Sequence, residues 1–165
     1  MSETANNAPG QPLSKAVRAV VIASVAEAQR RNSTLVEAEH LLLALSRDGS
    51  SPIREVLADA GLDPDGLEVA LRTEREASLR VAGIEPLGEE RLVSSPRVAR
   101  PRWGASAKEA LSRAHRVASA HRRQRSGEAD LVTAILGLEL GTVPRALLLA
   151  GVDRPAVVAA VRTVG

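Results

Sequence analysis

The chain has 165 residues, of which 44% are hydrophobic, and its 22 basic and 20 acidic side chains leave a formal net charge of only +2. It has one Trp and no Tyr, Phe or Cys, which excludes disulfides, zinc–thiolate sites and thiol catalysis. The near-neutral charge argues against nucleic-acid binding. A core built from Leu, Val, Ile and Ala favours helices, so we predict an all-α fold.

Residues 1–12 are small, polar and interrupted by Gly and Pro, which predicts a disordered tail. They show no basic segment followed by an apolar one, as a secretory leader would. The most apolar stretch, Leu131 to Val152, is broken by charged residues, Gly and Pro, which argues against a membrane span. We therefore expect a cytoplasmic protein.

Start and stop signals divide residues 13–78 into four predicted helices. Their start signals are Ser14, a capping box of Thr34 with Glu37, Ser51-Pro52 and Asp63-Pro64. The first helix ends near Arg31, the third at Gly61 and the fourth near Ser78. A stripe of valines at helical spacing predicts the buried face of the first helix: Val17, Val20, Val21 and Val25.

Residues 79–102 are interrupted by Gly and Pro and are predicted to be a linker. Helix signals resume in residues 103–165, where four more helices are expected. Their start signals are a capping box of Ser106 with Glu109, then Glu128, Thr142 and Asp153 with Pro155. The second of these helices is expected to end at Leu140 and the third at Gly151.

The two halves of the chain resemble each other. Residues 60–63 match 150–153 at an offset of 90, residues 28–31 match 120–123 at 92, and residues 37–39 match 128–130 at 91. A repeat of this length indicates a duplicated four-helix unit. We expect two tandem units packed about a pseudo-twofold axis, with eight helices in total.

Residues 36–45, VEAEHLLLAL, followed by Arg47-Asp48-Gly49, resemble the core motif G-T-E-H-I-L-L-G-L of the Clp amino-terminal domain, or double Clp repeat. Residues 128–132, EADLV, resemble it more weakly, and residues 103–108, WGASAK, resemble the start of the family's second repeat. The resemblance covers about residues 13–164. The family domain stands at the front of AAA+ unfoldases, but no G-x-x-x-x-G-K-[ST] motif is present here, so we expect a stand-alone domain without an ATPase.

Catalytic and metal-binding patterns are weak. His115 and His121 are six residues apart and fall on different faces of one helix, and His40 is expected to be structural. The sequence has no G-x-S-x-G nucleophile motif. We expect a protein that is not an enzyme and that holds no metal and no cofactor.

In the family, an acid at the start of the second helix of each repeat receives the guanidinium of phosphorylated arginine, and nearby hydroxyls and amides take the phosphate. The positions that the resemblance assigns to this site are Ser14, Glu39 and Asp130. The family's Thr before the acid is Ala38 or Ala129 here, and its Gly is Glu37 or Glu128. Because added acids repel phosphate, we expect weak or absent phosphoarginine binding, with Glu39 as the better site. The alternative is that each acid only stabilises its own helix N-terminus.

Actinobacterial members of the family bind peptides and cyclic-peptide antibiotics in a groove between the first helices of the two repeats. The matching positions here are Arg18, Val21, Ile22, Trp103, Lys108 and Leu111. Trp103 has the alternative role of plugging the core. A basic run at residues 121–125, HRRQR, either complements a helix C-terminus or contacts phosphate or an acidic partner.

The resemblance implies a non-catalytic protein that binds peptides, degradation tags, adaptors or cyclic-peptide antibiotics in the Clp chaperone–protease system. Without an ATPase it would sequester ligands of the full-length unfoldase. One alternative is an ancillary subunit that docks on the unfoldase ring. A less favoured alternative is a nucleic-acid-binding regulator that uses the basic run.

Overall fold

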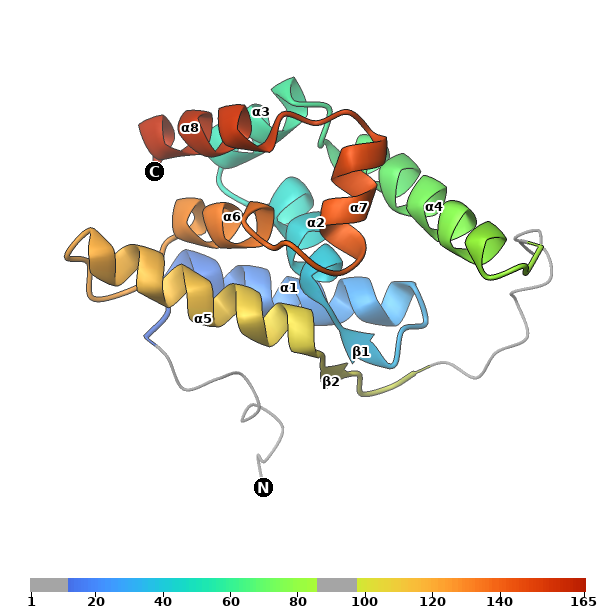
Figure 1. The fold of residues 1–165 in the computed structure, drawn as a ribbon. Helices are drawn as coiled ribbons and strands as arrows, with labels where there is room; N and C mark the ends of the chain where they lie inside the picture. The colour runs from blue at the N-terminus through green and yellow to red at the C-terminus, as the bar shows by residue number, and fades with distance from the viewer. Residues whose placement is uncertain (1–11, 86–97) are drawn as a thin grey trace.

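Eight α-helices and two short strands form the part of the chain that the computed structural model describes, residues 12–85 and 98–165 (Figure 1). Residues 1–11 and 86–97 lie outside it, so the predicted tail and the middle of the predicted linker stay predictions. The first repeat holds α1 (Lys15–Arg30), β1 (Leu35–Val36), α2 (Ala38–Asp48), α3 (Ser51–Asp59) and α4 (Pro64–Val81). The second holds β2 (Arg102–Trp103), α5 (Ala105–Ala120), α6 (Glu128–Leu136), α7 (Thr142–Leu149) and α8 (Arg154–Val164). The all-α prediction is confirmed.

The repeat has one uniform offset of 90 residues. Helices α1 and α5 span equivalent positions at this offset. The turns that follow them place Asn32 and Arg122 at positive φ, 52° and 57°, a conformation that few non-glycine residues adopt. Gly61 and Gly151 are likewise both at positive φ. The offsets of 91 and 92 expected from the sequence are therefore wrong.

Each repeat pairs its first residues with the other repeat. Strand β1 lies parallel to β2, with Val36 opposite Trp103, and the amide of Gly104 donates to the Val36 carbonyl at 2.9 Å. The equivalent pair is the isolated bridge between Leu13 and Ser126, which is closed by a hydrogen bond from the Ser14 amide to the Ser126 carbonyl at 3.0 Å. Each repeat thus makes the same backbone pairing with the other, as the expected pseudo-twofold relation requires.

The helices also pack across the repeats. Helix α1 packs on α2, and α5 on α6, within each repeat, whereas α3 packs on α8 and α4 on α7 (Figure 1). The central helices α2 and α6 contact each other. The last two helices of each repeat are thus held by the other repeat, and the two repeats share one core.

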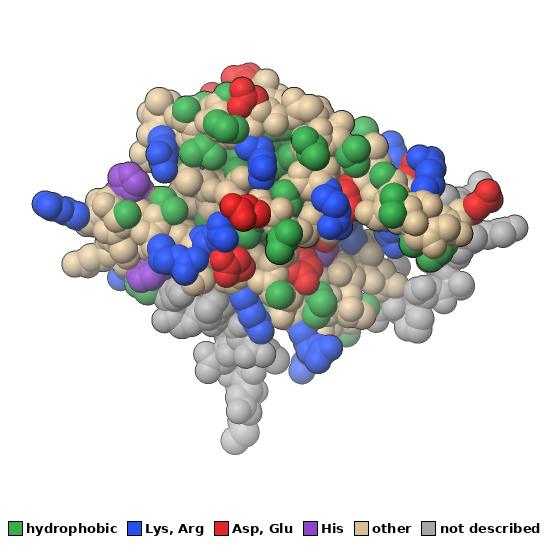
Figure 2. All heavy atoms as spheres, viewed as in Figure 1, with side chains coloured by type: hydrophobic (Ala, Val, Ile, Leu, Met, Phe, Trp, Pro, Cys, Tyr) green, Lys and Arg blue, Asp and Glu red, His purple; other side chains and the backbone are tan. Residues whose placement is uncertain are grey.

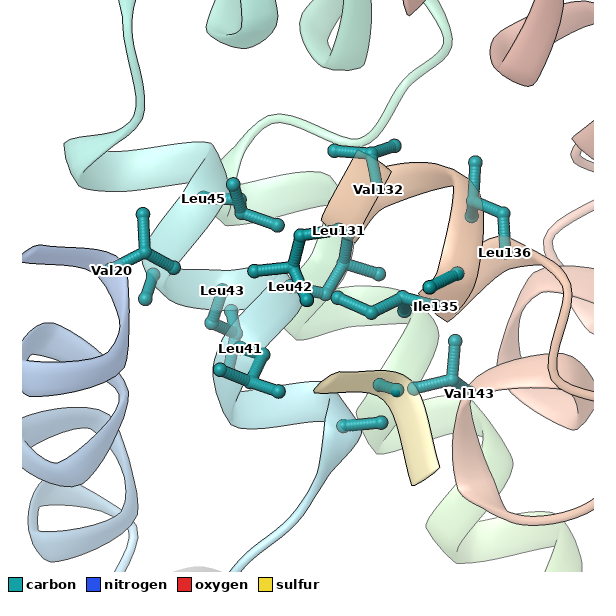
Figure 3. Close-up of a cluster of buried hydrophobic side chains, with 14 of the residues drawn as sticks. Val20, Leu41, Leu42, Leu43, Leu45, Leu131, Val132, Ile135, Leu136 and Val143 are labelled. Atoms are coloured by element: carbon teal, nitrogen blue, oxygen red, sulfur yellow. The ribbon is translucent and has the colours of Figure 1, made fainter. Parts of the chain in front are cut away.

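Leucine side chains of α2 fill the centre of this core, where they meet apolar residues of α6 (Figure 3). The residues that Figure 3 labels are Val20, Leu41, Leu42, Leu43, Leu45, Leu131, Val132, Ile135, Leu136 and Val143. Helix α2 is apolar on nearly all sides because other helices surround it. Its first turn is consequently fixed in position, and the candidate site lies there.

Three predicted N-caps are confirmed. The side chains of Ser14, Asp63 and Asp153 each accept a hydrogen bond at 3.1 Å from the backbone amide three residues later, at the starts of α1, α4 and α8. Helix α4 continues to Val81, three residues beyond the predicted end, and α6 ends at Leu136 rather than Leu140.

The two predicted capping boxes are wrong. Helix α2 begins after Glu37, because Leu35–Val36 is drawn into the pairing with β2 and Thr34 therefore lies outside the helix. Helix α5 begins after Gly104, so Ser106 is its second residue, and Glu109 instead pairs with Arg113 one turn later, at 2.6 Å.

Candidate functional site

A cavity of about 320 Å³ opens beside the first turn of α2. We call it the repeat-one cavity. Three segments line it besides α2: the turn after α1, helix α4, and the start of α7 from the other repeat. The lining residues are Arg31, Asn32, Ser33, Glu39, His40, Leu71, Glu74, Arg75 and Thr142. The packing of α4 on α7 is therefore part of what shapes this cavity.

Glu39 is the second residue of α2 and lines the cavity without a partner. Among the described residues, no ion pair or hydrogen bond to another side chain engages its carboxylate. Burial raises the pKa of this carboxyl above its usual value, and Glu37 and Glu74 raise it further, while its own backbone amide and Arg31 lower it. A carboxylate that is desolvated and unpaired is stabilised by any cation that enters the cavity.

His40 has a structural role, as expected. Its side chain is buried, and Nδ1 accepts a hydrogen bond at 2.9 Å from the backbone amide of Glu37. Burial and the nearby Arg31 lower the pKa of His40 to about 4, against the opposing effect of Glu37. The ring is therefore neutral at pH 7, with its proton on Nε2, and it caps the N-terminus of α2.

The other charges of the cavity are mostly paired. Arg31 forms an ion pair with Glu68 at 2.5 Å, and the buried Glu74 accepts from Nε of Arg145 at 2.7 Å. Arg75 is exposed and forms no ion pair within the described residues. No role at this site was predicted for these residues from the sequence. Glu74 follows Leu67 and Leu71 on the apolar stripe of α4, and a charged residue at such a position indicates a special environment.

The N-termini of α2 and α5 are capped reciprocally. The Glu37 carboxylate accepts from the Ser106 amide at 3.0 Å and from the Ser106 hydroxyl, and that hydroxyl accepts from the Ala38 amide at 2.8 Å. A Cβ at Gly104 would lie 2.0 Å from Oε1 of Glu37, so any larger residue here would displace this carboxylate from its present position. The helix N-terminus that would attract a phosphate is thus filled by the chain's own acid.

A second cavity, of about 110 Å³, lies at the equivalent place in repeat two. We call it the repeat-two cavity. Its residues Ala129 and Asp130 stand 90 positions after Glu39 and His40. Asp130 accepts the Gly127 amide at 2.8 Å, the capping bond that His40 makes in repeat one. The predicted equivalence of Glu39 with Asp130 is therefore wrong. The residue of repeat two that is equivalent to Glu39 is Ala129, so repeat two has no acid at this position.

The residues of the predicted peptide groove differ in exposure. Ile22 is 73% exposed on α1, Arg18 and Lys108 are exposed, and Trp103 is partly buried against the core. Val21 and Leu111 are only 8% and 1% exposed and belong to the core. Arg18 matches Lys108, and Val21 matches Leu111, at the offset of 90, so four of the six residues form two equivalent pairs.

Ser14, the third residue of the predicted phosphoarginine site, uses its hydroxyl to cap α1. Within residues 12–85 and 98–165, no three His, Asp or Glu side chains form a group that would hold a metal ion. None of the helices described is long and apolar enough to cross a membrane.

Comparisons with known proteins agree with this architecture. Residues 12–95 match the sequence model of the Clp repeat (R) N-terminal domain. The N-terminal domain of the caseinolytic protease associated chaperone ClpD from Arabidopsis thaliana is similar in structure, with a TM-score of 0.66, 17% identity, and coverage of 92% of this chain and 96% of that one. The Hsp104 N-terminal domain from Candida albicans is similar with a TM-score of 0.62, 10% identity, and coverage of 92% and 89%. No curated protein sequence matches the chain. The chain belongs to the Clp repeat N-terminal domain family.

Proposed function

We propose that this chain is a non-catalytic binding domain of a Clp/Hsp100 chaperone system, which captures peptide segments of substrates or adaptors. The observation that carries the proposal is the repeat-one cavity with the unpaired carboxylate of Glu39. Its volume of about 320 Å³ accommodates a long side chain together with adjoining peptide atoms.

The ligand chemistry that this cavity favours is an arginine side chain. A guanidinium pairs with a carboxylate through two parallel hydrogen bonds, and it restores to Glu39 the partner that the fold withholds. Phosphoarginine is disfavoured, because Glu37 already occupies the amide and hydroxyl of Ser106 and would repel the phosphate. We therefore expect unmodified arginine to bind at least as well as its phosphorylated form.

Calorimetry with a short peptide that contains one central arginine tests this function. The control peptide carries citrulline, which has the same shape without the charge. Glu39→Gln is expected to weaken arginine-peptide binding about tenfold, the usual worth of one charged hydrogen bond. The matched control is Glu55→Gln, since Glu55 is exposed on α3 away from the cavity. Equal binding of both peptides, or equal binding by both variants, would contradict the proposal.

The exposed residues of the predicted groove are a second candidate surface, favoured by the 73% exposure of Ile22. Cyclic-peptide antibiotics and apolar adaptor segments are its expected ligands. Trp103 is the only aromatic residue, so the emission of the protein reports this surface. A hydrophobic cyclic peptide is expected to shift the emission, and Ile22→Ser and Trp103→Ala to weaken binding. If Trp103→Ala unfolds the domain and the peptide leaves the emission unchanged, Trp103 is a core plug.

A further inference from the structure

Basic side chains gather where α5 ends and the chain turns toward α6. His121 and Arg123 of this turn line the repeat-two cavity, and so does Arg162 of α8. Arg122 and Arg125 belong to the same turn and are exposed outside the lining of the cavity. Figure 2 shows Lys, Arg and His side chains collected at this end of the molecule. Neither the family assignment nor the proposed arginine site uses these residues.

Pairing within the repeat-two cavity leaves a positive charge free. The side chain of Asp130 is 2% exposed and binds both Arg123 and the Gly127 amide, so its charge is satisfied inside the fold. Arg123 is 44% exposed and offers further N–H donors beyond the one that Asp130 takes. Arg162 is exposed, lines the cavity and forms no ion pair within the described residues.

The two equivalent cavities differ in one unpaired acid. Among the described residues, repeat one has the partly buried, unpaired carboxylate of Glu39 beside the exposed Arg75, whereas repeat two has Ala129 at the position of Glu39 and keeps only the unpaired cation Arg162. Ser33 of the first cavity is replaced by Arg123 in the second. The first cavity suits a cation and the second suits an anion.

We propose that the repeat-two cavity binds an acidic peptide segment, with one carboxylate seated against Arg123 and Arg162 and further carboxylates against Arg122 and Arg125. The volume of about 110 Å³ is sufficient for a single carboxylate-bearing side chain. A peptide is favoured over nucleic acid for two reasons. The net charge is only +2, and the only Trp precedes the 16-residue helix α5 at its far end, so no large aromatic ring is available for base stacking here.

This site is separate from the repeat-one cavity and does not depend on the function proposed there. Fluorescence anisotropy of a labelled hexaglutamate peptide, at low ionic strength, tests it. Arg162→Gln is expected to weaken binding about tenfold, since an exposed, unpaired guanidinium is removed without disturbing the core. The matched control is Arg72→Gln, which removes the exposed arginine at the equivalent position of α4 and is expected to leave the affinity unchanged.

Three outcomes would overturn the proposal: equal binding of a hexaglutamine peptide, equal losses in the two arginine variants, or tighter binding of a single-stranded oligonucleotide than of hexaglutamate. The second outcome would mean that only the overall charge matters, and the third that nucleic acid is the ligand. Circular dichroism of both variants shows that any loss of binding is not a loss of fold.

Discussion

The ends of the two equivalent helices α1 and α5 are held by different chemistry. Near the end of α1, the Glu27 side chain is 2% exposed and pairs with Arg30 and, at 3.0 Å, with Arg47 of α2. The residue equivalent to Glu27 is Val117, and the residue equivalent to Arg47 is Gly137. One backbone arrangement thus tolerates a buried ion network in one repeat and its absence in the other.

The difference continues at helix starts. Helix α1 is capped by its own Ser14, whereas α5 has Gly104 at the matching position and borrows the carboxylate of Glu37. The N-terminus of α2 is capped by neutral His40, and that of α6 by the carboxylate of Asp130. The two repeats place different titratable and charged groups at equivalent positions, so they should respond differently to pH and to charge removal.

The largest expected effect is acid destabilisation through His40. Its folded-state pKa of about 4 lies below the value of 6.5 for an unperturbed His, so on acidification the unfolded chain takes up the proton first. Stability that is present above pH 6.5 is therefore lost as the pH falls toward 4, by about 3 kcal/mol for a shift of this size. Urea unfolding across this pH range measures the loss.

His40→Asn keeps an acceptor for the Glu37 amide and does not titrate, so it is expected to flatten this pH dependence. The Asp of repeat two would be a poor substitute, because it would face Glu37 and Glu39. The raised pKa of Glu39 acts with the opposite sign, since its protonation at low pH relieves a buried charge. The proteins with and without His40→Asn are therefore compared in a Glu39→Gln background. If His40→Asn left the pH dependence of the unfolding free energy unchanged, His40 would not be its source.

A somewhat smaller effect is expected from Arg47→Ala, which leaves the buried carboxylate of Glu27 with only the exposed Arg30. We expect about 2–3 kcal/mol of destabilisation, below the usual loss for a broken buried pair because Arg47 is itself partly exposed. Adding Glu27→Val introduces the residue that repeat two has at the equivalent position, Val117, and removes the unpaired carboxylate. It is expected to recover at least half of the lost stability. A double variant less stable than Arg47→Ala would show that repeat one cannot adopt the apolar solution.

Local features of the fold could be predicted from the sequence. Caps at Ser14, Asp63 and Asp153 depend on residues three positions apart, and all three were found. The exchange of Leu13 and Trp103 between repeats was not predictable, because strand pairing joins residues far apart in the chain. For the same reason the capping boxes failed: Ser106 has the right spacing for its own helix but donates its hydroxyl across the repeats.

The candidate site could be predicted only in part. Glu39 was found through the motif around it. Residues 37–39 look more like residues 128–130 than like their true equivalents, 127–129, so the sequence alignment of the two repeats was wrong by one position at Asp130. The hydrogen bonds of the caps set the register, and they are not visible in residue types. Thr142 reaches the repeat-one cavity only because α7 packs on α4.

The borrowed cap predicts unequal losses from two serine truncations. Ser106→Ala is expected to destabilise the protein by about 1.5 kcal/mol, because it removes the bond to the Ala38 amide and a donor to Glu37 together. Ser14→Ala removes one bond within α1 and is expected to cost about 1 kcal/mol. Thermal and urea unfolding compare the two variants. A greater loss in Ser14→Ala would mean that the joint between α2 and α5 carries little stability.

An effect of similar size is expected on ligand binding. Phosphoarginine is expected to bind the natural protein weakly at most, with Glu39→Ala removing that binding, because Glu37 fills the N-terminus of α5. Changing Glu37→Gly together with Gly104→Ser removes this carboxylate and supplies a hydroxyl in the space it leaves, as Ser14 does for α1. The amide and hydroxyl of Ser106 are then free for a phosphate, and affinity for phosphoarginine should rise about tenfold, close to 1.4 kcal/mol. Calorimetry with phosphoarginine and with arginine separates the two parts of the ligand, since only the phosphorylated form should gain. Tight phosphoarginine binding by the natural protein would show that a ligand displaces Glu37 from this position without help.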